Sequence, residues 1–163
     1  MLRSFIMVMA LCLSSAAFAV SVGDAAPNFK LPNLQSGKLA SLKKYRGKVV
    51  YLDFWASWCG PCRQSLPMLN GLRNELKRKG FEVVAVNLDE DSADAKAFLK
   101  QFPVSYPVLL DPNGKVPEKY ELPGMPTSFL IDKRGRIRHI HIGFKPKDMK
   151  DIRQQVIALL RKK

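Results

Sequence analysis

The sequence has few of the side chains that bind transition metals most tightly, with three cysteines and two histidines among its 163 residues. A structural zinc site needs four ligands, and the one closely spaced cysteine pair, Cys59 and Cys62, has no second pair to join it. His139 and His141 alternate along a predicted strand without a third ligand. We therefore expect no metal site.

Long apolar runs and nucleotide-binding motifs are also absent. Beyond the N-terminal segment no run of 18 apolar residues occurs, which argues against a membrane-spanning helix there. No glycine fingerprint for NAD or flavin is present, so we expect no cofactor. With 47% apolar residues, the chain can bury one core, and we expect a single domain over 20–163.

Acidic residues are scarce, since 14 Asp and Glu stand against 27 Lys and Arg and give a formal net charge of +13. The basic residues lie in short scattered groups, such as 43–48 and 133–138, which is typical of solvated faces on ordinary elements. This scatter, together with a predicted export signal, argues against nucleic acid as a partner. A peripheral attraction to an anionic membrane surface or an acidic partner remains, and it would act on the association rate.

The first nineteen residues have the pattern of a secretory signal peptide. Arg3 supplies a positive start, residues 5–13 form an apolar stretch that is short for a bilayer, and Ala17-Phe18-Ala19 is an A-x-A cleavage signal. We expect cleavage before Val20 and a periplasmic protein, with an uncleaved membrane tether as the alternative. The third cysteine, Cys12, would leave with this segment, so that only the closely spaced pair remains.

That pair directly follows an apolar run of strand length, residues 49–55. Two thiols at C-x-x-C spacing, where a strand leads into a helix, can close into a disulfide and open again, and so can carry two electrons. We predict a helix from Cys59 to about Lys79. Its buried face is indicated by leucines at three- and four-residue steps, namely Leu66, Leu69, Leu72 and Leu76.

The two thiols should differ in reactivity. Cys59 opens the predicted helix, where free backbone N–H groups and the positive end of the helix dipole favour a thiolate. The thiolate is the species that attacks disulfides, so we predict that Cys59 is the nucleophile. Cys62 lies one turn further in with less access to water, and we predict that it resolves the mixed disulfide.

The rest of the chain alternates between strand and helix patterns. An extended lead-in over 21–36 is followed by a short strand and turn over 39–44. The nearly continuous apolar run 81–88 is typical of a strand that is buried on both faces and parallel to its neighbour. The other predicted elements are strands over 106–110, 127–132 and 136–142 and helices over 92–102, 116–120 and 147–161. This order predicts an α/β sandwich with a mixed central sheet flanked by helices.

Several motifs occur together in this order. They are DFWASWCGPC over 53–62, Pro67 inside the cysteine helix, GMPTSFLID over 124–132, and an insertion between the two halves of the fold. In this combination the chain resembles the thioredoxin superfamily, specifically the exported TlpA/ResA-like thiol-disulfide oxidoreductases. The resemblance covers residues 21–162. It implies a thioredoxin-like sandwich with an N-terminal extension and a central strand-helix insertion.

The resemblance also implies where a substrate would bind. Pro126 would form a cis peptide bond beside the cysteines, and the backbone of Met125 would pair with an extended substrate segment. An ordinary turn proline is the alternative. The remaining substrate contacts would come from the residues around the cysteines, namely Trp58, Gly60 and Pro61.

Two acidic residues are candidates for proton transfer. Asp53 falls where thioredoxin has a buried aspartate, and a carboxyl in a low dielectric has a raised pKa and can take the proton from Cys62. A solvated acid at a strand end is the alternative. Glu90 matches the acid that ResA-like proteins place near their cysteines, although it could also belong to a solvated acidic turn.

The Gly60-Pro61 dipeptide is that of thioredoxin, whose reduction potential of about −270 mV lies near the reducing end of the scale. We therefore expect a reductant of exported protein thiols. The resemblance suggests the haem-binding thiols of a c-type apocytochrome or copper-ligand thiols as clients. It also suggests a membrane thiol-disulfide transporter as electron donor.

Two other function classes remain open at this point. A thiol peroxidase of the peroxiredoxin type would need the signature P-x-x-x-T-x-x-C, but Leu52 and Ala56 stand at its first two positions. A non-catalytic thioredoxin-like chaperone or binding module would keep its function without Cys59.

Overall fold

The computed structural model describes residues 20–162, so the predicted signal peptide over 1–19 lies outside the described range. The strands are β1 (Lys30–Pro32), β2 (Leu39–Ser41), β3 (Val49–Trp55), β4 (Phe81–Asn87), β5 (Val108–Leu110), β6 (Thr127–Ile131) and β7 (Ile137–Ile142). The α-helices are α1 (Cys62–Leu76), α2 (Ser92–Gln101), α3 (Lys115–Tyr120) and α4 (Met149–Arg161). Three 3-10 helices complete the fold: η1 (Leu42–Tyr45), η2 (Lys77–Lys79) and η3 (Pro146–Asp148).

β3 is the central strand of a five-stranded sheet with the order β5-β4-β3-β6-β7. It pairs in parallel with β4 and antiparallel with β6, so that Asp53 lies between Ala85 and Ser128. All seven residues of β3 are buried, because the sheet is covered on both faces. The predicted mixed sheet and the parallel pairing of the 81–88 run are confirmed.

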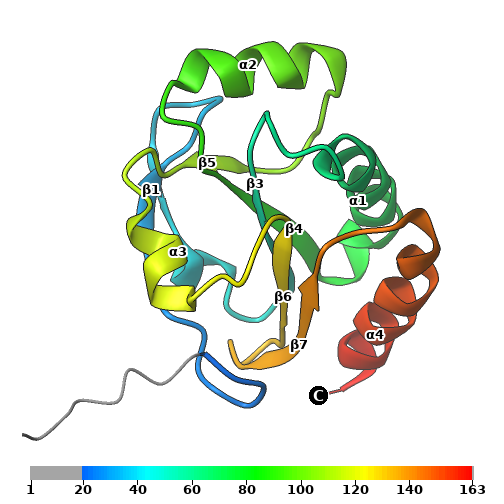
Figure 1. Ribbon diagram of the computed structural model, residues 1–163. Helices are drawn as coiled ribbons and strands as arrows, with labels where there is room; N and C mark the ends of the chain where they lie inside the picture. Colours follow the sequence, from blue (N-terminus) through cyan, green and yellow to red (C-terminus); the bar gives the residue numbers. More distant parts are fainter. Residues whose placement is uncertain (1–19, 163) are drawn as a thin grey trace, which may run out of the picture.

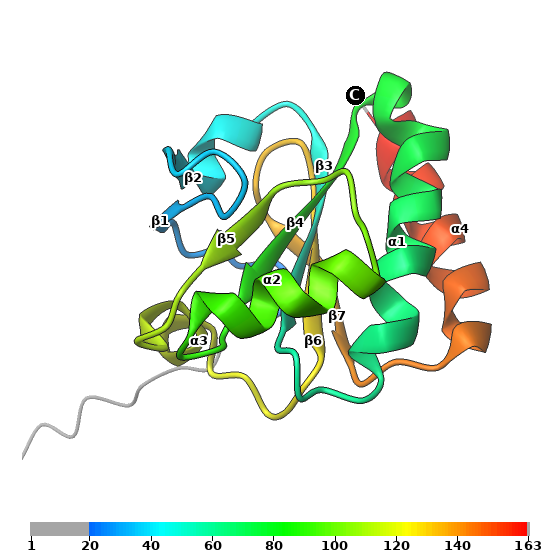
Figure 2. The same ribbon diagram turned by 90° about the horizontal axis from the view of Figure 1, so that it is seen from above.

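Two layers of helix and loop cover the sheet. Figures 1 and 2 show α1 and α4 side by side on one face, with the β1–β2 hairpin and α3 on the other. Strand residues alternate between these layers. Trp55 packs on the α1 side in one apolar cluster with Leu69. Phe54 packs on the opposite side against Tyr120 of α3, with a ring-centroid distance of 5.3 Å.

Single side chains define how α2 begins and how α4 packs. The N-cap of α2 is Asp91, because the Asp91 carboxylate accepts a hydrogen bond from the backbone N–H of Ala93. In α4 Leu159 is buried, while Leu160 is half-buried at the edge of the core. Among residues 20–162 no helix combines the length and the apolar character needed to cross a bilayer.

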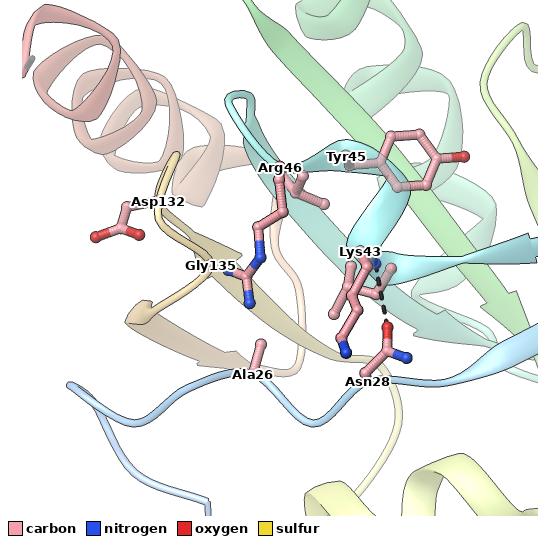
Figure 3. Close-up of a pocket in the computed structure, with 9 residues that line it drawn as sticks. Ala26, Asn28, Lys43, Tyr45, Arg46, Asp132 and Gly135 are labelled. Atoms are coloured by element: carbon pink, nitrogen blue, oxygen red, sulfur yellow. Dashed lines mark hydrogen bonds between the residues drawn. The ribbon is translucent and has the colours of Figure 1, made fainter.

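The turn between β6 and β7 depends on a glycine. Gly135 has a φ of +77°, and the guanidinium of Arg46 lies where a Cβ at this position would be (Figure 3). Arg46 also donates a hydrogen bond to the backbone carbonyl of Arg134. The narrow pocket at this turn is lined by neither cysteine of the pair, so we assign it a structural role.

The substitution Leu69→Ala should lower the free energy of unfolding by about 2–5 kcal/mol, because it leaves a cavity between α1 and the sheet. Leu69 is 1% exposed. The matched control is Leu39→Ala on β2, where the side chain is 65% exposed and the change should stay within about 0.5 kcal/mol. Urea unfolding of the oxidised protein measures both values. Equal losses for the two variants would contradict the assigned inner face of α1.

Candidate redox site

The cysteine pair lies where β3 leads into α1. Cys59 and Cys62 form a disulfide with an S–S distance of 2.03 Å. The predicted helix start at Cys59 is wrong, because residues 59–61 form a turn and α1 begins at Cys62. In this turn the carbonyl of Cys59 accepts a hydrogen bond from the N–H of Cys62 at 3.1 Å, and Pro61 has no N–H to donate. Cys59 therefore lies three residues before the first residue of the helix.

Both cysteines are buried, and they differ slightly in residue exposure. Cys62 is fully buried at 0% exposure, whereas Cys59 keeps 4%. Trp58, the residue before Cys59, is 68% exposed and is one of the few large apolar side chains on the surface. A partner that approaches from outside would meet Trp58 and Cys59 first. The predicted difference in water access between the two cysteines agrees with this geometry.

A buried acid at the end of β4 holds the turn before the cysteines. The Asp89 carboxylate accepts hydrogen bonds from the backbone N–H and the hydroxyl of Ser57, both at 3.0 Å, and from the Asn87 side-chain amide at 2.8 Å. Asp89 is 4% exposed, while the neighbouring Glu90 is exposed. The sequence analysis selected Glu90 and missed Asp89. A usable signal was the Asn-x-Asp pattern at the end of the strand parallel to β3.

The proline loop lies at the same end of the sheet as the cysteines. The peptide bond between Met125 and Pro126 is cis, as the resemblance implied. Thr127, the next residue, pairs with Phe54 near the end of β3. Pro126 is buried, and its carbonyl accepts a hydrogen bond from the N–H of Gly143 at 2.7 Å. Met125 is half-buried and touches both apolar clusters.

Asp53 lies inside the sheet and is 1% exposed. Its side chain has the same orientation as Tyr51 and Trp55, toward the layer that contains Cys62, because alternate strand residues share a face. Oδ1 accepts a hydrogen bond from the Ser128 hydroxyl at 2.6 Å, and Oδ2 has no hydrogen-bond partner among the described residues.

The surroundings of Asp53 change its acidity. Burial raises the pKa of Asp53 to about 7, and the hydrogen bond from Ser128 opposes part of that rise. The carboxyl can therefore take up and release a proton near neutral pH. Sequence reasoning missed Ser128, although a hydroxyl opposite the acid in an otherwise apolar strand was a readable signal.

Known proteins resemble the chain over most of its length. Residues 21–156 match the family described as Redoxin. The thiol-disulfide oxidoreductase ResA of Bacillus thuringiensis subsp. konkukian (strain 97-27) is 41% identical over 118 residues, which are 72% of this chain and 68% of that protein. The ResA of Bacillus subtilis (strain 168) is 34% identical over 151 residues, with coverage of 87% and 84%.

Solved structures agree with these relatives. A crystal structure of a protein assigned as the thiol:disulfide interchange protein DsbE from Chlorobium tepidum superposes with a TM-score of 0.84. Its sequence is 50% identical, and the match covers 87% of this chain and 99% of that one. These comparisons confirm the resemblance that the cysteine and proline motifs indicated.

The raised pKa of Asp53 should make stability depend on pH. The folded protein binds this proton up to about pH 7, while the unfolded chain loses it near pH 3.8. The contribution of Asp53 to stability should therefore be greatest below pH 4, fall by up to about 4 kcal/mol as the pH rises to 7, and stay level above that. Thermal unfolding of the oxidised protein across this range measures the slope.

Asp53→Asn should remove this slope, and the exposed acid Glu90 offers the matched control Glu90→Gln, which should keep it. The same slope in Asp53→Asn as in the wild type would contradict the raised pKa of Asp53.

Proposed function

The chain belongs to the redoxin family of the thioredoxin superfamily and is a thiol-disulfide oxidoreductase, and on this basis we propose that it reduces disulfides of exported partner proteins. The main support is the asymmetry of the redox pair. Cys59 keeps 4% exposure and follows the exposed Trp58, while Cys62 is fully buried in the layer toward which Asp53 points.

In this proposal the reduced protein starts the reaction with the thiolate of Cys59. The thiolate attacks one sulfur of a client disulfide, a bond forms between Cys59 and that sulfur, and the client's other sulfur leaves as a thiolate. Cys62 then gives its proton to Asp53 and attacks Cys59 Sγ. The Cys59–Cys62 disulfide forms, the second client thiolate leaves, and two electrons have moved to the client.

Asp53 suits the role of proton acceptor because Oδ2 has no partner and the carboxyl titrates near neutral pH. A fully ionised surface acid would be a weaker base for a thiol, since general bases work best when their pKa lies near the working pH. Glu90 is exposed on the turn before α2, which favours Asp53 over Glu90 for this role.

The client would bind across the end of the sheet. Pro126 has no N–H, while the backbone of Met125 can pair with an extended client segment beside the disulfide. Trp58 offers an exposed apolar surface, and Gly60 and Pro61 complete the rim. These four residues and Pro126 would hold the client disulfide against Cys59.

We further propose a reducing direction and an exported location. The Gly60-Pro61 dipeptide supports the direction, as in thioredoxin at about −270 mV. The signal-peptide pattern over 1–19 supports export to the periplasm, with residues 20–163 as the working domain. Clients would be cysteines of exported proteins, such as apocytochrome c or copper-site thiols, and a membrane thiol-disulfide transporter would supply electrons. The excess of basic residues could add attraction to anionic membranes.

Cys62→Ser should trap clients, because Cys59 still attacks but no second thiol resolves the mixed disulfide. Non-reducing gels of cells that express this variant should show protein adducts that disappear with dithiothreitol. The matched control Cys59→Ser should give none and should leave insulin unreduced. Adducts at equal levels in both variants, or peroxide consumption by the purified protein, would contradict the proposal.

The reduction potential should lie close to that of thioredoxin, about −270 mV. Equilibration of the purified protein with dithiothreitol mixtures, followed by thiol alkylation, measures it. A value near −120 mV would make the protein an oxidant and would contradict the proposed direction.

A further inference from the structure

The proposed reaction leaves a proton on a carboxyl that has almost no contact with water. Asp53 is 1% exposed and Cys62 is fully buried. Before the next turnover Asp53 either returns this proton to Cys62 when the disulfide is reduced or exchanges it with solvent, and exchange with solvent needs a route through the surrounding protein. The described residues contain one row of polar side chains that starts at Asp53 and runs across β6 to β7.

The first members of this row are set by strand register. Asp53 on β3 lies directly opposite Ser128 on β6, and Ser128 lies directly opposite His141 on β7. Directly opposed residues have their side chains on the same face of a sheet. Ser128 donates its hydrogen bond to Asp53 Oδ1 at 2.6 Å.

Tyr51 connects the inner part of the row to the outer part. It precedes Asp53 by two positions, so its side chain lies on the same face, and it is 1% exposed. Its hydroxyl is 3.1 Å from His141 Nδ1, and the two rings stack with centroids 5.6 Å apart. Tyr51 pairs with Leu130, two positions after Ser128, so Tyr51 and Ser128 are diagonal neighbours on the same face, within reach of a long side chain. Burial and then the charge of Asp53 raise the pKa of Tyr51.

His141 is the outer end of the row and is half-buried. Its Nε2 lies 2.8 Å from Oε1 of Gln155 on α4. Burial lowers the pKa of His141, which favours the neutral ring that can accept a proton at Nδ1. The hydrogen bond to Gln155 and the charges of Asp148 and Asp151 raise this pKa, and His139 lowers it.

We propose that Ser128, Tyr51 and His141 form the path by which Asp53 exchanges its proton with solvent during the proposed reductase cycle. The carboxyl, protonated at Oδ2, turns so that this oxygen faces Ser128, and the Ser128 hydroxyl turns from Asp53 toward Tyr51. The carboxyl proton then moves to the Ser128 oxygen, and the Ser128 proton moves to the Tyr51 oxygen. The Tyr51 proton moves to Nδ1 of His141, and the imidazolium releases a proton to water. Both hydroxyls and the neutral imidazole are restored, and the one charge that the transfer leaves inside is that of the Asp53 carboxylate.

Tyr51 and His141 act through Asp53 and are relay residues. Hydrogen bonds that only stabilise the fold could give the same arrangement of side chains. The test therefore compares Tyr51 with another buried tyrosine of the same core. Tyr106 provides it, because it is equally buried and also lies near Asp53, but its hydroxyl donates to the backbone carbonyl of Leu66 at 3.2 Å. That bond ends in the backbone and leads to no further side chain.

The exchange rate of the Asp53 proton can be measured without a client by NMR of the protein labelled with ¹³C at aspartate carboxyl carbons. In the wild type the Asp53 signal should move continuously as the pH passes through its titration, because exchange is fast. In Tyr51→Phe the exchange rate should fall by about tenfold or more, with broadening or two separate signals at the midpoint. Tyr106→Phe should titrate like the wild type.

A second variant separates a relay from a structural role. His141→Ala should slow exchange to a similar degree, and added imidazole should restore it, because His141 is half-buried and a small base can replace it near the surface. Wild-type exchange in Tyr51→Phe, or slow exchange in His141→Ala that imidazole does not restore, would overturn the proposed path. Either result would leave the reductase proposal intact, since that proposal is tested by client trapping.

Discussion

The structure depends on the complete burial of β3 between two hydrogen-bonded neighbours. A strand that pairs on both edges and packs on both faces has little freedom to move, and its end therefore fixes the position of whatever follows. Here the following residues are the turn with Cys59 and the first turn of α1. The antiparallel pairing with β6 brings the cis-proline loop to the same end, so one strand orders the redox pair and the loop beside it.

The same strand carries a polar group where an apolar one would be more stable. The free-energy cost of burying the ionised Asp53 carboxylate grows with the rise in its pKa. Ser128 offsets part of this cost through its hydrogen bond to Oδ1, while Oδ2 has no hydrogen-bond partner among the described residues. Such a cost is typical of a site whose chemistry needs the group. The depth that makes the carboxyl a good base for Cys62 also separates it from water, so exchange of its proton with solvent needs a route outward.

Much of the fold could be predicted from periodicity and motif spacing, and the remainder depended on long-range contacts. The order of strands and helices and the redox pair follow from local patterns, but the three-residue turn at Cys59 does not. Asp89 and Glu90 are adjacent acids, and Asp89 is distinguished by its contacts with Asn87 nearby and with Ser57, which is distant in the chain. The alternation of His139 and His141 indicated a shared face, but their surroundings depend on residues that are distant in the chain.

The central claim is that Cys59 is an unusually acidic thiol that a partner can reach. The most direct test is the rate of alkylation of Cys59 in the reduced Cys62→Ser variant as a function of pH. The account predicts a thiolate that forms at least about one pH unit below the value of a free cysteine, near 8.5. A midpoint at or above that value, or a thiol that does not react, would contradict it.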